Sequence, residues 1–177
     1  MKYLIPLLCG LLLLLSCKRS LTQNNEIIKV ELARSGAWSD YGATISMDTS
    51  LNYKYFGDYM NWKQKYFAGK ISPKYWDSVN QKFEKINFKT VAPHSKLVIL
   101  DDDYFELIIY WKGGRRSITR YWDGGQEPIL KVFDWLSSSY KSVKLEQVNT
   151  PFKFETTTHR KPKPKIDQAK FPPPIKQ

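Results

Sequence analysis

The chain has 177 residues, a length typical of one domain, and is 42% hydrophobic and 15% aromatic. This composition supports a buried core and excludes an intrinsically disordered protein. The formal net charge is +11, of which residues 1–16 contribute only Lys2. Such a charge either attracts anionic partners or only keeps the surface solvated, and composition leaves both interpretations open.

The N-terminus has the composition of a bacterial export signal. Lys2 supplies the positive charge, and a nearly continuous apolar run extends from Leu4 to Leu15. About a dozen apolar residues suit a signal peptide and fall short of the roughly 20 that a membrane-spanning helix needs. Residues 1–16 are therefore predicted to be a signal peptide that is removed.

A second motif follows directly. The stretch Leu14-Leu15-Ser16-Cys17 resembles the lipobox of bacterial lipoprotein signals, with leucine three positions before the cysteine and a small residue next to it. The resemblance implies that the Cys17 thiol accepts a diacylglycerol and that its freed amine accepts a further chain. Several chains matter, because one chain alone anchors a protein only marginally. The alternative is an ordinary secretory signal with a chance cysteine. Residues 17–26 would then be a lipid-anchored tether. The resemblance to lipoprotein sorting signals implies that the non-acidic Lys18-Arg19 permits transfer to the outer membrane of a Gram-negative bacterium.

The first half of the remaining chain is rich in β-formers and then changes period. We predict strands at 27–33, 43–47, 51–56 and 62–71, with a loop at 48–50 and a bend at Gly69. Ser72-Pro73 has the pattern of a capped helix start. An apolar stripe continues to a helix end near Asn87 and consists of Trp76, Val79, Phe83 and Ile86.

The second half predicts a short buried strand at 97–100 and then a hairpin. Its strands are 105–111 and 116–122, closed by Gly113-Gly114, which places Ile109 opposite Ile118 and Phe105 opposite Trp122. Glu127-Pro128 opens a second helix. Its apolar positions recur through Ile129, Phe133, Leu136, Tyr140 and Val143. A last strand is expected at 145–148.

These elements define one α+β domain over residues 27–150. We expect a twisted, mainly antiparallel sheet with two helices packed on one face. Residues 151–177 are assigned to a basic, disordered tail rich in proline and lysine. From Thr156 onward it lacks periodicity and is predicted to be extended and disordered.

A resemblance covers roughly residues 27–146. The runs GKISPKYWDSVNQKFEKINF and DDDYFELIIYWKGGRRSITRYWDGGQEPILKVFDWL resemble a family of uncharacterised bacterial domains, many of them on lipoproteins. Its pattern is a strand ending in glycine, a helix, a polar loop, a hairpin, a glycine-containing loop and a closing helix. The resemblance implies this architecture and no activity.

Residues for catalysis are scarce in the mature chain. His159 lies in the tail and His94 in a loop, no Gly-x-Ser-x-Gly motif is present, and the only cysteine left is Cys17. We therefore predict no catalytic residue, no cofactor and no metal. Two alternatives stay open, a calcium site at Asp101–Asp103 and an envelope hydrolase that uses Asp101–Asp103, Glu106 and Asp123.

Binding residues are easier to nominate. Four cationic residues cluster around the predicted hairpin, namely Lys112, Arg115, Arg116 and Arg120. They form either a solvated turn or a patch for phosphate or carboxylate groups. Tyr110 and Tyr121 are predicted on the face opposite Ile109 and Ile118, and so join the candidate binding residues. Aromatic residues also crowd the first half, where core packing and ligand stacking are both possible.

Together these features predict a membrane-anchored envelope lipoprotein with a non-catalytic binding or structural domain. Its partners would be the membrane, through the lipid on Cys17, and a protein or anionic envelope polymer. Export excludes nucleic acid. An envelope hydrolase and a purely structural lipoprotein without a specific ligand are the alternatives.

Overall fold

The structure, a computed structural model, describes residues 26–36, 42–58, 64–94, 103–122, 124 and 126–157. This part of the chain contains one antiparallel sheet of seven strands and two α-helices, which confirms the mixed α+β class. Two predicted features, the strand at 97–100 and the signal peptide with its lipidation site, lie outside the described residues.

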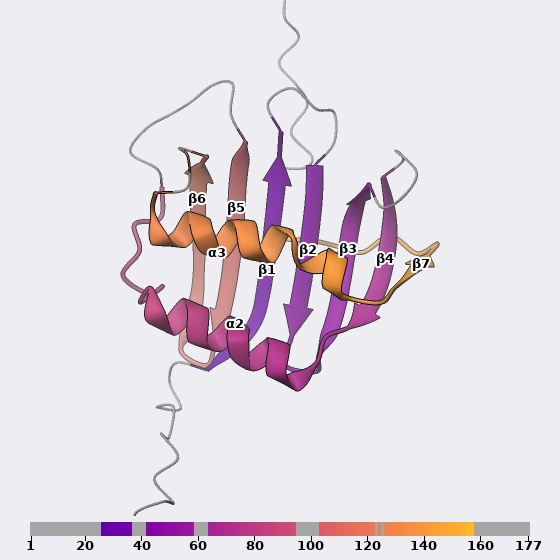
Figure 1. The fold of residues 1–177 in the computed structure, drawn as a ribbon, viewed down its shortest axis with the longest axis horizontal. Coiled ribbons are helices and arrows are strands. Elements are labelled where there is room, and N and C mark those ends of the chain that lie inside the picture. The colour runs from indigo at the N-terminus through magenta and orange to yellow at the C-terminus, as the bar shows by residue number, and fades with distance from the viewer. Residues whose placement is uncertain are drawn as a thin grey trace, which may run out of the picture.

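The sheet has the strand order β6-β5-β1-β2-β3-β4-β7, and every neighbouring pair is antiparallel (Figure 1). The strands are β1 (Ile27–Ser35), β2 (Gly42–Asp48), β3 (Asn52–Asp58), β4 (Gln64–Lys70), β5 (Tyr104–Trp111), β6 (Gly114–Tyr121) and β7 (Leu145–Val148). The first strand thus lies inside the sheet, between β5 and β2. All strands predicted within the described residues are present, including the short β7 at one edge.

The first helix, α2 (Pro73–Lys85), begins and ends as the sequence predicts. The Ser72 hydroxyl accepts a hydrogen bond from the Tyr75 backbone N–H at 3.1 Å, which satisfies one free donor of the first turn. At the other end Asn87 has a φ of 47°, a left-handed conformation that asparagine tolerates well. The N–H groups of Asn87 and Phe88 donate to the carbonyls of Glu84 and Phe83, which closes the helix with a Schellman motif.

The second helix, α3 (Pro128–Ser137), is shorter than its apolar periodicity suggests. After Ser138 the chain tightens into a short 3-10 helix, η2 (Ser139–Ser142). The Ser139 hydroxyl is hydrogen-bonded to the Tyr53 hydroxyl of β3 at 2.6 Å. Burial raises the pKa of Tyr53 far above its usual range, so this hydroxyl stays protonated. Val143 is buried although it follows η2, so the apolar pattern continues beyond the α-helix.

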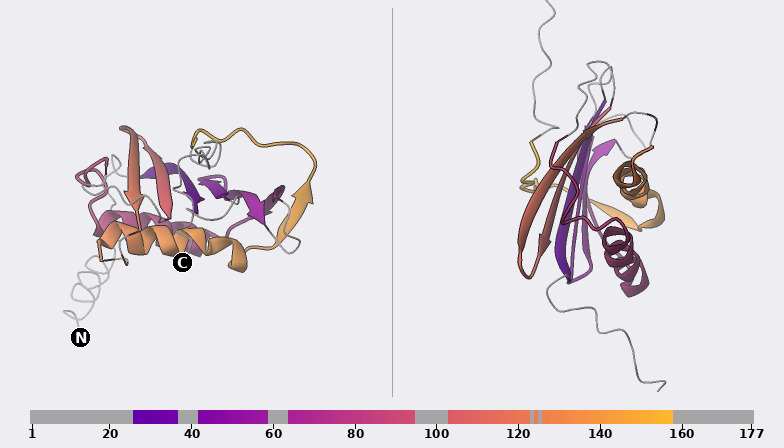
Figure 2. Two further views of the ribbon diagram at one scale, coloured as in Figure 1. Left: turned by 90° about the horizontal axis from the view of Figure 1, so that it is seen from above. Right: turned by 90° about the vertical axis from the view of Figure 1, so that its left-hand side faces the viewer.

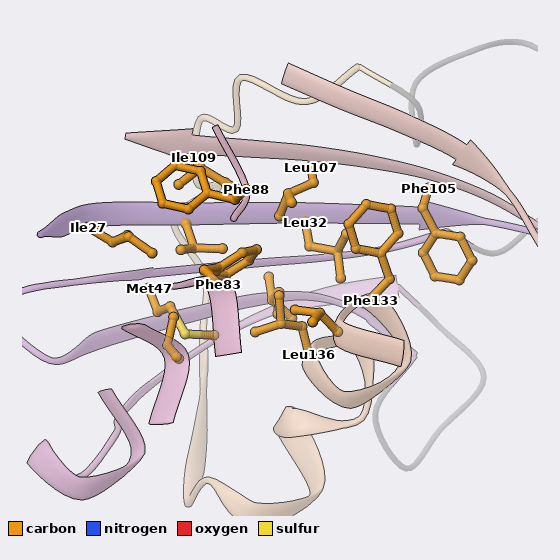
Figure 3. Packing of buried hydrophobic residues seen from close by; sticks show 14 of the residues in the cluster. Ile27, Leu32, Met47, Phe83, Phe88, Phe105, Leu107, Ile109, Phe133 and Leu136 are labelled. Carbon is orange, nitrogen blue, oxygen red and sulfur yellow. The ribbon is translucent and has the colours of Figure 1, made fainter. Parts of the chain in front are cut away.

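One hydrophobic core joins the sheet to both helices. Figure 1 shows α2 and α3 in front of the sheet, and the side view in Figure 2 shows them on the same side. Phe83 of α2 and Phe133 of α3 are fully buried and belong to one cluster with Leu32 and Leu107 (Figure 3). We call the sheet face that carries Leu32 and Leu107 the core face.

The hairpin formed by β5 and β6 differs from the prediction. Leu107 pairs with Ile118 and Ile109 pairs with Arg116, so the predicted pairing of Ile109 with Ile118 is wrong by two residues. Phe105 likewise pairs with Arg120, not with Trp122. The turn lies at Lys112 and Gly113, while Gly114 is already the first residue of β6.

Gly114 packs closely against the residue paired with it. A Cβ atom at this position would lie 3.1 Å from the indole ring of Trp111, the residue paired with it across the hairpin. A larger residue here would require the Trp111 ring to move by a few tenths of an ångström, so glycine suits this strand position, whereas the prediction assigned it to the turn. A shift of two residues keeps every side chain on its face, because strand side chains alternate.

Candidate binding face

The sheet face opposite the core is crossed by the chain itself. Side chains alternate along strands, so this second face carries Lys29 and Glu31 of β1 and Glu106 and Tyr110 of β5. After β7, residues 151–157 run across it as an extended segment without regular structure, on the side of the sheet away from the helices (Figure 2). We call residues 151–157 the strap and the face beneath them the strap face.

The strap corrects the predicted start of the tail. The sequence assigned all of residues 151–177 to a disordered segment, but Phe154 and Thr156 are buried. Phe152 also contacts the sheet, with its ring edge-on to Tyr66 at 5.7 Å and the Lys54 ammonium 5.3 Å from its centroid. These aromatic contacts hold residues 151–157 on the sheet. Residues 158–177 lie outside the described part of the chain.

A buried carboxylate fixes the middle of the strap. Glu31 is only 1% exposed, and its Oε1 accepts hydrogen bonds from the backbone N–H groups of Glu155 and Thr156, both at 2.6 Å. Its other oxygen, Oε2, lies 3.3 Å from the Lys29 ammonium. One carboxylate thus satisfies two consecutive main-chain donors and is balanced by a neighbouring cation, which makes its burial tolerable.

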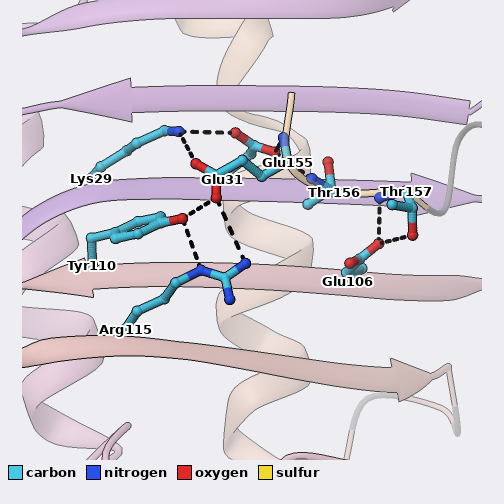
Figure 4. A network of polar contacts seen from close by, with 8 residues as sticks. All are labelled: Lys29, Glu31, Glu106, Tyr110, Arg115, Glu155, Thr156 and Thr157. Atoms are coloured by element: carbon cyan, nitrogen blue, oxygen red, sulfur yellow. Dashed lines mark hydrogen bonds and ion pairs between the residues drawn. The ribbon is translucent and has the colours of Figure 1, made fainter. Parts of the chain in front are cut away.

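The side chain of Glu155 is held by three other groups (Figure 4). The Lys29 Nζ lies 3.0 Å from Oε1, the Tyr110 hydroxyl donates to Oε2, and Arg115 Nη2 lies 3.7 Å from Oε2. Arg115 also donates from Nε to the Tyr110 hydroxyl at 2.8 Å. The hydrogen bond from Tyr110, supported by Lys29 and Arg115, holds the pKa of Glu155 below its usual range despite some burial.

These contacts perturb the donors as well. Burial and the hydrogen bond with Glu155 raise the pKa of Tyr110. Burial opposes the charge of Lys29, but the hydrogen bonds and charges of Glu155 and Glu31 outweigh it and raise its pKa. At neutral pH the arrangement therefore consists of a protonated tyrosine, two cations and the ionised Glu155.

The structure separates the six predicted binding residues. Tyr110 and Arg115 meet at Glu155 on the strap face. Lys112, in the hairpin turn, pairs with Glu26 at 2.8 Å. Tyr121 lies on the strap face, where its ring contacts Tyr104 edge-on at 4.9 Å. The predicted patch is thus not one surface.

The other two predicted residues, Arg116 and Arg120, are on the core face and bind main-chain carbonyls. Arg116 donates to the carbonyls of Lys89 and Val91. Arg120 donates to the carbonyl of Ala92 at 3.0 Å and pairs with Glu127 at 2.9 Å. Both side chains therefore hold the segment after α2 against the β6 edge of the sheet.

Lys29 and Glu155 are the two contributors to this site that the sequence analysis missed. Lys29 precedes Glu31 by two residues in a predicted strand, so the two side chains share a face. The signal for the strap is the alternation Phe152-Lys153-Phe154-Glu155, which is typical of an extended segment on an apolar surface.

Of the residues considered for catalysis or metal binding, those that the structure describes each have a separate partner. Asp103 pairs with Arg34, and Glu106 accepts a hydrogen bond from the Thr157 backbone N–H at 2.8 Å. His94 is hydrogen-bonded to Thr119 at 3.1 Å. In the described ranges, no three His, Cys, Asp or Glu residues converge as metal ligands. Asp101, Asp102 and Asp123 lie outside those ranges.

Comparison with known proteins finds no matching protein-family model and no curated protein with significant sequence similarity. The resemblance to bacterial lipoprotein domains therefore stays a prediction. Within the described part of the chain, neither helix has the length and apolar character that crossing a bilayer requires.

Proposed function

We propose that this protein is an envelope lipoprotein, held on a membrane by lipid at Cys17, which binds an anionic polymer without catalysing a reaction. In this proposal the helices cover one face of the sheet and the strap face is the binding face. The observation that carries the proposal is the group of Lys29, Tyr110 and Arg115, which converges on a carboxylate. Cations and a hydroxyl arranged in this way suit the charged groups of a polyanion.

The charge distribution supports the same partner. Residues 158–177 contain six Lys or Arg residues and one Asp, so they carry +5 of the formal +11. A dense cationic segment attracts polyanions over a distance of about 10 Å at moderate salt. The described domain would then supply short-range contacts and the tail long-range attraction.

The first test truncates the chain after Thr157, which removes the cationic tail and leaves the strap intact. We expect the truncated protein to bind purified cell-wall sacculi more weakly than the full chain, and increasing salt to reduce the difference. A matched control keeps the tail length and replaces its six Lys and Arg residues by Gln. Equal binding by all three proteins would remove the tail from the proposal.

The second test addresses the anchor. Cells expressing the full chain and fed a labelled fatty acid should incorporate the label, and a Cys17→Ser variant should not. An unlabelled, unprocessed wild-type chain would refute the lipoprotein assignment.

A further inference from the structure

We propose that Lys29, Tyr110 and Arg115 form a binding site for carboxylate groups of the anionic partner, and that Glu155 occupies this site within the same chain until the partner replaces it. The inference rests on the proposed function and specifies its ligand chemistry. Glu155 would thus act as a built-in competitor of the polymer.

The geometry of the three groups fits a carboxylate. Lys29 approaches one oxygen of Glu155 at 3.0 Å, while Tyr110 and Arg115 approach the other. Arg115 also orients the Tyr110 hydroxyl through its Nε at 2.8 Å. Two oxygens of one planar group are therefore addressed from separate sides, as a carboxylate from any source would be.

The occupant can leave without unfolding the strap. Glu31 binds the backbone N–H of Glu155, so the main chain is fixed independently of the Glu155 side chain. The side chain itself is 43% exposed. Exchange with an external carboxylate therefore requires only rotation of the Glu155 side chain, and no movement of Phe154 or Thr156. Rotation of an exposed side chain takes only nanoseconds.

The local charge favours such an exchange. Lys29 and Arg115 carry two positive charges, and Glu31 and Glu155 carry two negative charges. Glu31 is buried and paired with Lys29, so it stays in place. Withdrawal of Glu155 leaves this group of side chains with a net charge of +1, centred near Arg115, for an incoming anion.

The test uses the protein truncated after Thr157, so that the tail does not contribute, and a fluorescently labelled hexaglutamate peptide as the probe. We expect Glu155→Gln to lower the Kd about two- to fivefold, the range that corresponds to an exposed ion pair of up to 1 kcal/mol. The matched control is Glu146→Gln, an exposed glutamate at the β7 edge of the strap face. It makes the same charge change away from the site and should leave the Kd unchanged.

The substitution Arg115→Gln is expected to change the Kd for hexaglutamate in the opposite direction. It should weaken hexaglutamate binding, and the gain from Glu155→Gln should disappear when both substitutions are combined, because the two act on one site. The control for this change is Lys131→Gln on the exposed surface of α3.

Two results would overturn the inference. One is an equal Kd for the Glu155→Gln and unsubstituted proteins, including the case in which neither binds the probe. The other is an equal gain from Glu146→Gln, which would show a general charge effect. Either result leaves the proposed function standing if the full-length protein binds sacculi. A full-length protein that does not bind sacculi would refute the proposed function itself.

Discussion

The two faces of the sheet are covered in different ways. The core face packs against large apolar side chains such as Phe83 and Phe133, which are fully buried. The strap face is covered by seven residues of extended chain, held by the carboxylates of Glu31 and Glu106 and by a few aromatic contacts. Apolar burial is insensitive to charge, whereas the Glu155 side chain of the strap is 43% exposed, so acid and competing anions can reach its contacts. The core face therefore stabilises the fold, and the strap face is suited to change its contacts.

The largest expected effect distinguishes apolar contacts on the two faces. Phe133→Ala should lower the free energy of unfolding by about 3–5 kcal/mol, because it leaves a cavity in the core. Phe152→Ala, on the half-buried ring of the strap, should cost less than about 2 kcal/mol. Urea unfolding of both variants measures the contrast, and equal losses would contradict the division of roles.

A smaller effect is expected from the carboxylate under the strap. Glu31→Ala should cost about 2 kcal/mol, because the N–H groups of Glu155 and Thr156 lose their acceptor. Hydrogen exchange should accelerate at these two amides while the amides of α2 stay protected. Glu106→Ala, which removes the acceptor for the exposed Thr157, is the milder comparison. Uniform acceleration throughout the domain would mean that the strap and core are one cooperative unit.

The smallest effect concerns acid. Because the pKa of Glu155 is lowered from its ordinary value of 4.5, its ionised form stabilises the folded chain. This contribution is complete above 4.5 and is lost as the pH falls through the lowered pKa. Wild type should exceed Glu155→Gln in stability by less than about 1 kcal/mol at neutral pH, since the side chain is exposed. The difference should vanish in strong acid, and a pH-independent difference would exclude the ionised carboxylate as its cause.

Local signals predicted much of the fold. Ser72-Pro73 marked the start of α2, β-forming residues located β1, and the alternation of Leu51, Tyr53 and Tyr55 located β3. Such features succeed because caps and periodicity depend on neighbouring residues only. The predicted hairpin register was wrong because both glycines were assigned to the turn, whereas Gly114 is the first residue of β6 and packs against Trp111, its partner across the hairpin.

The candidate site was less predictable, since it joins residues far apart in the sequence. Tyr110 was expected on the face opposite Ile109, but nothing local connects it to Glu155, 45 positions later. Glu155 follows the proline at 151 and precedes a Lys- and Pro-rich segment, a composition that suggests disorder. Only tertiary contacts with Glu31 show that this segment belongs to the domain.

The course of the strap also sets how the domain would respond to mechanical tension. Thr157 contacts Glu106, whose partner on β1 is Ala33, while β1 begins at Ile27, about 20 Å away along the strand. From Glu155 to Thr157 the strap runs along β1 in its own direction. If the chain is anchored by lipid and binds a polymer as proposed, a pull between the two would load the hydrogen bonds to Glu31 and Glu106 together, in shear. The force would pass directly from β1 to the strap, and both helices would lie outside its path.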